Sequence, residues 1–223
     1  GQNIYRIWYD KPASYWEEAL PVGNGRIAAM VFGDPQLEQI QLNEETVSAG
    51  SPYQNYNEEA KTALPEMRRL IFEGKYEEAQ NMAATKILSQ VGNEMPYQTV
   101  GRLNIRYQDH KKVNNYYRDL DISNAVAVTR YEVDGVEFTE ETFASFTDQL
   151  VIRHIKASKP GTINCELFFN TPMRDPKRSI YGKKGLRLEG ITHGSRYFPG
   201  KVHYCADLDV KHKGGKVITA NDT

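Results

Sequence analysis

Apolar and polar residues alternate with a period of two along most of the chain, and the alternating runs end at glycine, proline or aspartate. The first run covers residues 4–9. Most of the others follow residue 97, at 102–107, 126–138, 139–146, 150–157, 162–170, 185–190, 202–210 and 216–219. Asp134 and Gly135 interrupt the run at 126–138 and favour a type I′ hairpin turn. So many strands at this spacing predict a mainly β fold, a large antiparallel β-sandwich of the supersandwich kind.

Two strands near the N-terminus carry the most informative residue order. Residues 27–32 form a continuous apolar run, which predicts a strand buried on both faces. A tight turn precedes it at 23–25, where Gly-Asn-Gly tolerates positive φ. The next strand, 38–42, alternates, and we expect its end to deliver Asn43 and Glu44 into a loop.

Residues 57–88 change to the helical period. Asn57, followed by two acids, is a typical helix N-cap, and Pro65 fits the start of the next helical segment. Gly74 separates a second helix at 75–88, so the pattern predicts a helical hairpin inserted into the β domain. The apolar stripe along the second helix is typical of packing.

Composition excludes several classes of partner. The chain has 28 Lys and Arg against 29 Asp and Glu, a formal charge of −1, so neither nucleic acid nor an anionic membrane surface is expected to bind. The longest apolar run is far shorter than the about 20 residues of a membrane-spanning helix. Basic residues gather at 172–184, where we expect a solvated loop. We expect a single domain over residues 1–223, with a helical insertion at about 57–88.

Residue spacing supports neither a metal nor a nucleotide site. The five histidines lack HExxH spacing and a cysteine pattern, and the Gly-Asn-Gly turn lacks the third glycine and the helix of a dinucleotide site. Cys165 and Cys205 fall on opposite kinds of strand face, which disfavours a disulfide. Asp207 and Asp209 share a face and could bind a cation, although a solvated face is the simpler interpretation. We therefore expect no cofactor.

Three strings of residues carry a family resemblance. They are PVGNGRIAAMVFG at 21–33, LNEET at 42–46 with a following SAGSP turn, and MPYQ at 95–98 followed by Gly101. In this order they resemble the N-terminal domain of glycoside hydrolase family 95, the α-L-fucosidases and their relatives that act on other sugars. Ala28 and Ser48 depart from the family pattern, which usually has Gly and Trp there.

The resemblance implies a non-catalytic sandwich that supports a catalytic (α/α)6 barrel. Inverting hydrolysis requires an acid and an activated water, served by two carboxyl groups about 6.5–9.5 Å apart. The family places these groups in the barrel, so the resemblance assigns no catalytic residue to this chain. It also implies truncation at the C-terminal end, a downstream barrel as the partner, a glycan substrate for the full-length protein, and a periplasmic or extracellular location.

Asn24, Arg26, Asn43 and Glu44 are the candidate site residues, because polar groups follow hydrophobic strands at both places. The hypothesis is that they face the barrel and either wall the sugar pocket or lock the two domains together. The simpler interpretation is that both asparagines bond neighbouring backbone and Arg26 pairs with a nearby acid. Glu44 and Glu45 are adjacent and point to opposite faces of a strand, so they are not expected to form a catalytic pair.

Two further expectations remain open. The chain could instead be a carbohydrate-binding sandwich without a hydrolytic role, using some of its 14 tyrosines, or a purely structural domain. An open groove lined by parallel rings would favour the binding module. We also expect an exposed sheet edge to pair with a second copy of the chain, giving an edge-strand dimer.

Overall fold

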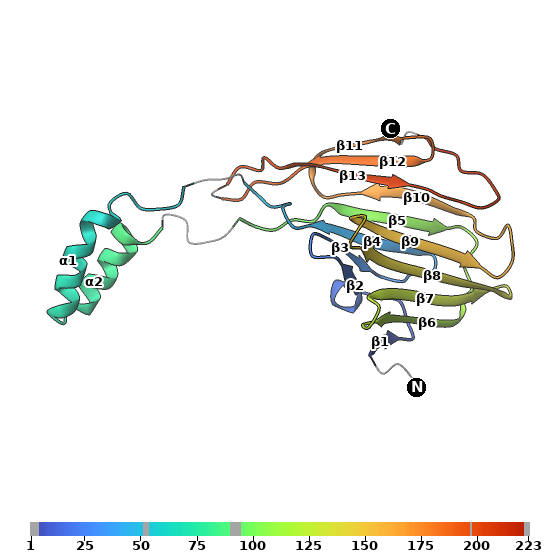
Figure 1. The fold of residues 1–223 in the computed structure, drawn as a ribbon, viewed down its shortest axis with the longest axis horizontal. Helices are drawn as coiled ribbons and strands as arrows, with labels where there is room; N and C mark the ends of the chain where they lie inside the picture. Colours follow the sequence, from blue (N-terminus) through green and yellow to red (C-terminus); the bar gives the residue numbers. More distant parts are fainter. Residues whose placement is uncertain (1–4, 51–53, 90–94, 197, 221–223) are drawn as a thin grey trace.

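A computed structural model of the chain describes residues 5–50, 54–89, 95–196 and 198–220 (Figure 1). Within these ranges the chain forms three antiparallel sheets and a pair of helices, which confirms the mainly β fold with a helical hairpin. None of the described helices is both long and apolar enough to cross a bilayer.

The first sheet has the strand order β1-β6-β7-β8-β9. Its strands are β1 Arg6–Tyr9, β6 Asn114–Asp121, β7 Val126–Val133, β8 Val136–Ser145 and β9 Leu150–Ala157. The β7–β8 turn confirms the type I′ prediction, because Asp134 and Gly135 both have positive φ, at 49° and 74°.

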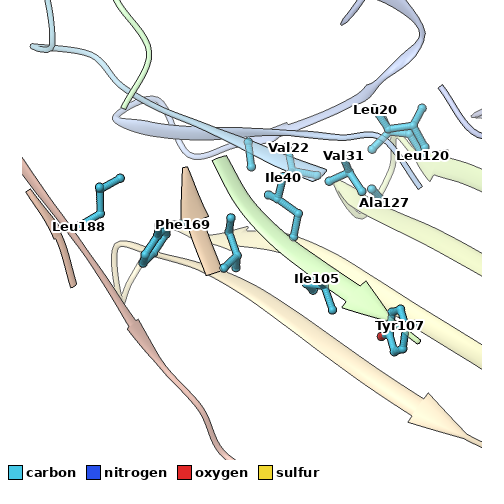
Figure 2. Packing of buried hydrophobic residues seen from close by; sticks show 12 residues of the cluster. Leu20, Val22, Val31, Ile40, Ile105, Tyr107, Leu120, Ala127, Phe169 and Leu188 are labelled. Carbon is cyan, nitrogen blue, oxygen red and sulfur yellow. The ribbon is translucent and has the colours of Figure 1, made fainter. Parts of the chain in front are cut away.

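The second sheet has the order β10-β5-β4-β3-β2. Its strands are β2 Leu20–Gly23, β3 Ile27–Val31, β4 Leu37–Glu44, β5 Gly101–Tyr107 and β10 Cys165–Asn170, and a short 3₁₀ helix, Trp16–Glu18, precedes β2. Side chains from the facing surfaces of the first and second sheets form one core (Figure 2). Leu20 and Val31 from the second sheet join Leu120 and Ala127 from the first.

A third sheet lies beside β10, at the top of Figure 1, in the order β11-β12-β13. Its strands are β11 Arg174–Tyr181, β12 Gly185–Ile191 and β13 His203–Asp209. Leu188 of β12 is fully buried and belongs to the same core as Phe169 of β10 (Figure 2). The Arg178 guanidinium of β11 also donates through Nε to the Phe169 carbonyl, at 2.9 Å.

The helical insertion consists of α1 Ala60–Phe72, α2 Tyr76–Met82 and a π-helical turn, Ala83–Ile87. Pro65 lies inside α1, so the prediction that it starts a helix is wrong. The first turn forms without it, because the Ala63 amide donates to the Glu59 carbonyl at 2.9 Å. At an interior position proline removes one backbone donor and its ring crowds the carbonyl four residues earlier, so α1 forms in spite of Pro65.

The prediction that residues 27–32 are buried on both faces is wrong. In β3, Ala29 and Val31 are buried, whereas Ala28 is exposed and Met30 is half-buried. The reason is that β3 packs on the first sheet with one face only. Its other face is not covered by any described part of the chain.

The prediction of a loop at 172–184 is also wrong, because β11 lies within this segment and pairs with β12, although most of its residues are solvent-exposed as expected. The arginine at its start has a structural role, because the Arg174 guanidinium donates hydrogen bonds to the carbonyls of Thr192 and Gly200. Residues 216–219, expected to be a strand, have no regular structure.

Candidate functional site

The three strings that carry the resemblance meet at one end of the second sheet. The backbone amides of Ala49 and Gln98 donate to Pro96 and Val47, at 2.8 and 2.9 Å, which pairs the second string with the third. The β2–β3 turn lies beside them because Ile27 is the register partner of Glu44. We call this region, residues 24–26, 43–49 and 96–101, the motif corner.

Asn24 fixes the β2–β3 turn and ties it to the first sheet. Its Oδ1 accepts hydrogen bonds from the amides of Arg26 and Ile27, at 3.1 and 2.9 Å. Its Nδ2 donates to the carbonyl of Ser145, at the end of β8, at 2.8 Å. All of these partners are backbone groups, so the observed role of Asn24 agrees with the simpler interpretation.

Arg26 and Glu44 form an ion pair at the edge of the motif corner, with Nε 3.2 Å from Oε1. The other oxygen of Glu44 accepts hydrogen bonds from the backbone amide and the hydroxyl of Thr46, at 2.8 and 2.5 Å. Partial burial opposes ionisation of Glu44, but the bonds from Thr46 and Arg26 outweigh it and hold its pKa below the usual value. The Arg26 side chain is 59% exposed and can still reach a second partner.

Asn43 lies apart from the other three candidates. The sequence predicted a loop at Asn43 and Glu44, but both residues belong to β4, where they pair with β3. Successive residues of a strand point to opposite faces, so Asn43 shares the outer face of the sheet with Gln41, whose Nε2 donates to its Oδ1 at 3.5 Å. The structure therefore joins Asn24, Arg26 and Glu44 and places Asn43 on the opposite face.

A shallow hollow of about 350 Å³ opens on this outer face, next to Asn43. It is lined by Gln41, Thr99, Gly101, Arg102, Asn170, Thr171 and Pro172. Arg102 is held over the Phe32 ring and donates to Gln39 at 2.6 Å. Apart from Gly101, which belongs to the third string, the sequence gives no signal for these lining residues, because polar residues on the outer face of a strand look the same whether they meet water or a ligand.

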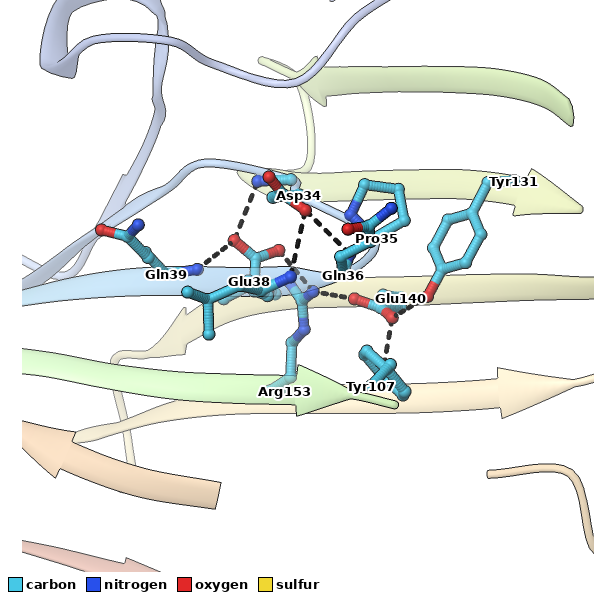
Figure 3. Close-up of polar contacts among 12 residues, drawn as sticks. Asp34, Pro35, Gln36, Glu38, Gln39, Tyr107, Tyr131, Glu140 and Arg153 are labelled. Atoms are coloured by element: carbon cyan, nitrogen blue, oxygen red, sulfur yellow. Dashed lines mark hydrogen bonds and ion pairs between the residues drawn. The ribbon is translucent and has the colours of Figure 1, made fainter. Parts of the chain in front are cut away.

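An ionic cluster lies between the first and second sheets (Figure 3). Arg153 on β9 reaches Glu38 on β4, at 2.7 Å, and Glu140 on β8. The hydroxyls of Tyr107 and Tyr131 donate to Glu140 at 2.9 and 2.7 Å. All three charged side chains are buried, so a sugar cannot reach the two carboxylates, and their role is structural.

The charges in this ionic cluster depend on one another. Burial raises the pKa of Glu38 above its usual value, although Arg153 opposes the shift. Burial would lower the pKa of Arg153, but Glu140 and Glu38 outweigh it and raise that pKa. The arginine therefore stays charged between the two acids.

The two aspartates and the two cysteines considered in the sequence form no metal site or disulfide: the aspartates are ion-paired within the chain, and the cysteines are free. Asp207 forms a two-bond ion pair with Arg187, at 2.6 and 2.7 Å, and Asp209 pairs with Lys211 at 2.7 Å. Cys165 and Cys205 are both free thiols. Burial raises the pKa of Cys165 to about 11, which keeps it protonated and unreactive at neutral pH.

Comparison with known proteins gives the family. The model described as "Glycosyl hydrolase family 65, N-terminal domain" matches residues 7–223. The chain belongs to this family. The sequence resembles family 95 instead, and this match does not confirm that assignment.

Three curated relatives of this family 65 N-terminal domain are named as fucosidases. Alpha-L-fucosidase 2 of Arabidopsis thaliana is 37% identical over 179 residues, which cover 78% of this chain and 21% of the relative. Probable alpha-fucosidase A of Aspergillus niger is 26% identical over 162 residues, 68% of this chain and 20% of the relative. The protein of the same name from Aspergillus oryzae is 24% identical over 199 residues, which cover 83% of this chain and 26% of the relative. The chain thus spans about a fifth to a quarter of these relatives.

Proposed function

We propose that this chain is the non-catalytic N-terminal domain of a glycoside hydrolase resembling the family 95 α-L-fucosidases. The observation that carries the proposal is the match of residues 7–223 to a glycosyl hydrolase N-terminal domain. The relatives named as fucosidases, each four to five times longer than the matched part, support it. The full-length parent would remove terminal sugars from glycans with inversion at the anomeric carbon, outside the cytoplasm and without a cofactor.

The partner of this domain, in the proposal, is a catalytic (α/α)6 barrel downstream in the same polypeptide, and the motif corner faces it. Ala28 and Met30 support a partner on the open outer face of β3, because they place apolar side chains on the face that they share with their register partners Asn43 and Gln41. A strand that is apolar on both faces is normally covered on both. Arg26 and Glu44 lie at the edge of the corner and not on that outer face, so they would line the sugar pocket or hold the barrel only where the barrel reaches around this edge.

Substitutions in the full-length polypeptide test the motif corner. We expect Arg26→Ala and Glu44→Ala each to lower kcat/KM for an aryl α-L-fucoside by about tenfold or more, because a small displacement at a pocket wall is costly. Arg106→Ala and Glu166→Ala are the matched controls, since this exposed pair, 2.8 Å apart, lies on the same sheet and away from the corner. Equal effects in both pairs would refute the assignment of the corner.

The reaction class needs its own measurement. Proton NMR of the first sugar released by the full-length polypeptide should show the anomer opposite to that of the substrate. Release of the same anomer would exclude inversion, and hydrolysis of a galactoside in preference to a fucoside would correct the sugar.

A second candidate function is glycan binding by the sandwich itself, and one observation favours it. Trp8 on β1 and Tyr117 on β6 stack with centroids 6.2 Å apart and planes at 20°, and Trp8 is 61% exposed. Such a ring pair suits the apolar face of a sugar. Saturable binding of a fucosylated glycan to this chain, lost in Trp8→Ala and kept in Trp16→Ala, would support this function. Failure of the unmodified chain to bind would reject it.

A further inference from the structure

The helical hairpin has an apolar side that no other described part of the chain covers. In α1, Ala63 and Leu70 are buried, whereas Leu64 is only half-buried and Ile71 is 41% exposed. Leu64 and Ile71 are seven residues apart and therefore lie on one side of the helix, next to the buried stripe. In α2, Tyr76 is 69% exposed although it lies one turn from the buried Ala79.

The two helices have little support of their own. They pack on each other and stand clear of the three sheets in Figure 1. α1 has 13 residues and α2 has seven, and isolated helices below about 12–15 residues are marginal in water. Only Ala63, Leu70 and Ala79 are buried among the described hydrophobic residues of the two helices, which is a small core for a helical pair.

The two chain segments that connect the hairpin to the sandwich both start at the motif corner. Ser48 and Tyr97 form a β-bridge at its base, next to the hydrogen bond from the Ala49 amide to the Pro96 carbonyl. Glycine is required there, because Gly50 has φ +99° and a Cβ would collide with Met95 and Phe198. The hairpin is therefore continuous with the surface that, in the proposed function, meets the rest of the polypeptide.

We propose that the helical hairpin is a docking arm, whose uncovered apolar side binds an apolar surface of the polypeptide that follows this domain. This inference rests on the proposed function. The occupant follows from two observations: the arm begins at the proposed interface, and the matched relatives are four to five times longer than the segment they share with this chain.

Hydrogen exchange of the full-length polypeptide and of this chain tests the docking arm. We expect amides of residues 60–87 to exchange about 100-fold more slowly, or slower still, in the full-length polypeptide, because docking removes local opening. Amides of β5 and β8 should exchange equally in both and serve as the internal control. Equal exchange of the hairpin in both proteins would overturn the proposal. So would protection that appears in this chain alone as its concentration rises, since the occupant would then be a second copy.

Single substitutions locate the docking side. In the full-length polypeptide, Ile71→Ser and Tyr76→Ser should remove the hairpin's extra protection, whereas the controls Glu66→Ser and Asn81→Ser, exposed polar positions on the far side of each helix, should keep it. Loss of protection in all four variants, or in none, would overturn the proposal. The fucosidase assay separates the two claims. If the full-length polypeptide hydrolyses the fucoside while its hairpin amides gain no protection, only the docking arm is refuted. If the hairpin amides gain protection but no fucoside is hydrolysed, only the proposed reaction is refuted.

Discussion

At the scale of single residues, Arg153 is the side chain on which the interior depends most. It is the guanidinium that two buried carboxylates share, and each carboxylate also accepts a hydrogen bond from another group: Glu38 from the Gly33 amide and Glu140 from the Tyr131 hydroxyl. Removing one member of a buried ion pair usually costs about 3–5 kcal/mol, because an uncompensated charge stays in the interior. We expect Arg153→Met to lower the free energy of unfolding by this amount at pH 7, measured by urea denaturation.

The cost of Arg153→Met should shrink as the pH falls from 7 to 5. A carboxyl group with a raised pKa in the folded state binds its proton more tightly there than in the unfolded state, so acidification stabilises the fold through that group. Burial already raises the pKa of Glu38 with Arg153 present, and loss of the cation should raise it further. Arg106→Met is the control, an exposed pair that should cost no more than about 1 kcal/mol at either pH. A deficit that grows on acidification would contradict this account.

Asn24 and Arg26 should separate structural from functional roles in the motif corner. Asn24→Ala removes two acceptor bonds and one donor bond to backbone groups, so we expect a loss of about 1–3 kcal/mol in the free energy of unfolding. Arg26→Ala removes one exposed ion pair and should cost less than about 1 kcal/mol. Chemical denaturation of both variants checks this order, and a costlier Arg26→Ala would reverse the interpretation.

At the scale of elements, two glycines with positive φ provide a matched pair. Gly25 has φ +91° with open space around its Cβ position, whereas at Gly33, with φ +75°, a Cβ would meet the Tyr116 hydroxyl at 2.8 Å. The left-handed backbone alone costs a residue with a side chain about 1–2 kcal/mol. We expect Gly33→Ala to cost about 1–3 kcal/mol more than Gly25→Ala, because packing is disturbed as well. Equal melting temperatures for the two variants would show that the Gly33 site relaxes freely.

Local pattern predicted the elements whose signals are local. The β7–β8 turn follows from Asp134 and Gly135, and β9 begins and ends where alternation begins and ends. β11 was missed because its basic residues resemble a loop, whereas Arg178 in fact donates to the carbonyl of Phe169 on β10 and Arg174 to that of Thr192, just after β12. Only the assembled sheets supply those acceptors.

The ionic cluster was missed for a similar reason. Glu38 shares strand parity with Ile40, and Arg153 shares it with Val151 and Ile155, so the pattern did place both charges on inward faces. Their pairing joins residues 115 positions apart and depends on how the sheets stack. The motif corner was found through sequence strings rather than periodicity. The hollow on its outer face, which shares Thr99 and Gly101 with the motif corner, was not found, because the rest of its lining comes from β4, β5 and the end of β10.

At the scale of the whole molecule, the open edges of the sheets bear on association. β13 pairs only with β12 among the described strands, so its other edge presents backbone groups that a second copy could pair with. We expect the mass measured by light scattering to rise toward that of a dimer as the concentration of this chain increases. A constant monomer mass would show that the edge is protected.

The central claim is that this sandwich is a scaffold and that the groups that cleave the sugar lie elsewhere in a longer polypeptide. The most direct test compares residues 1–223 with the full-length polypeptide in the same aryl α-L-fucoside assay, at equal molar concentration. Our account expects hydrolysis by the full-length polypeptide and none above the buffer rate by residues 1–223. Turnover by the purified 223-residue chain would contradict it.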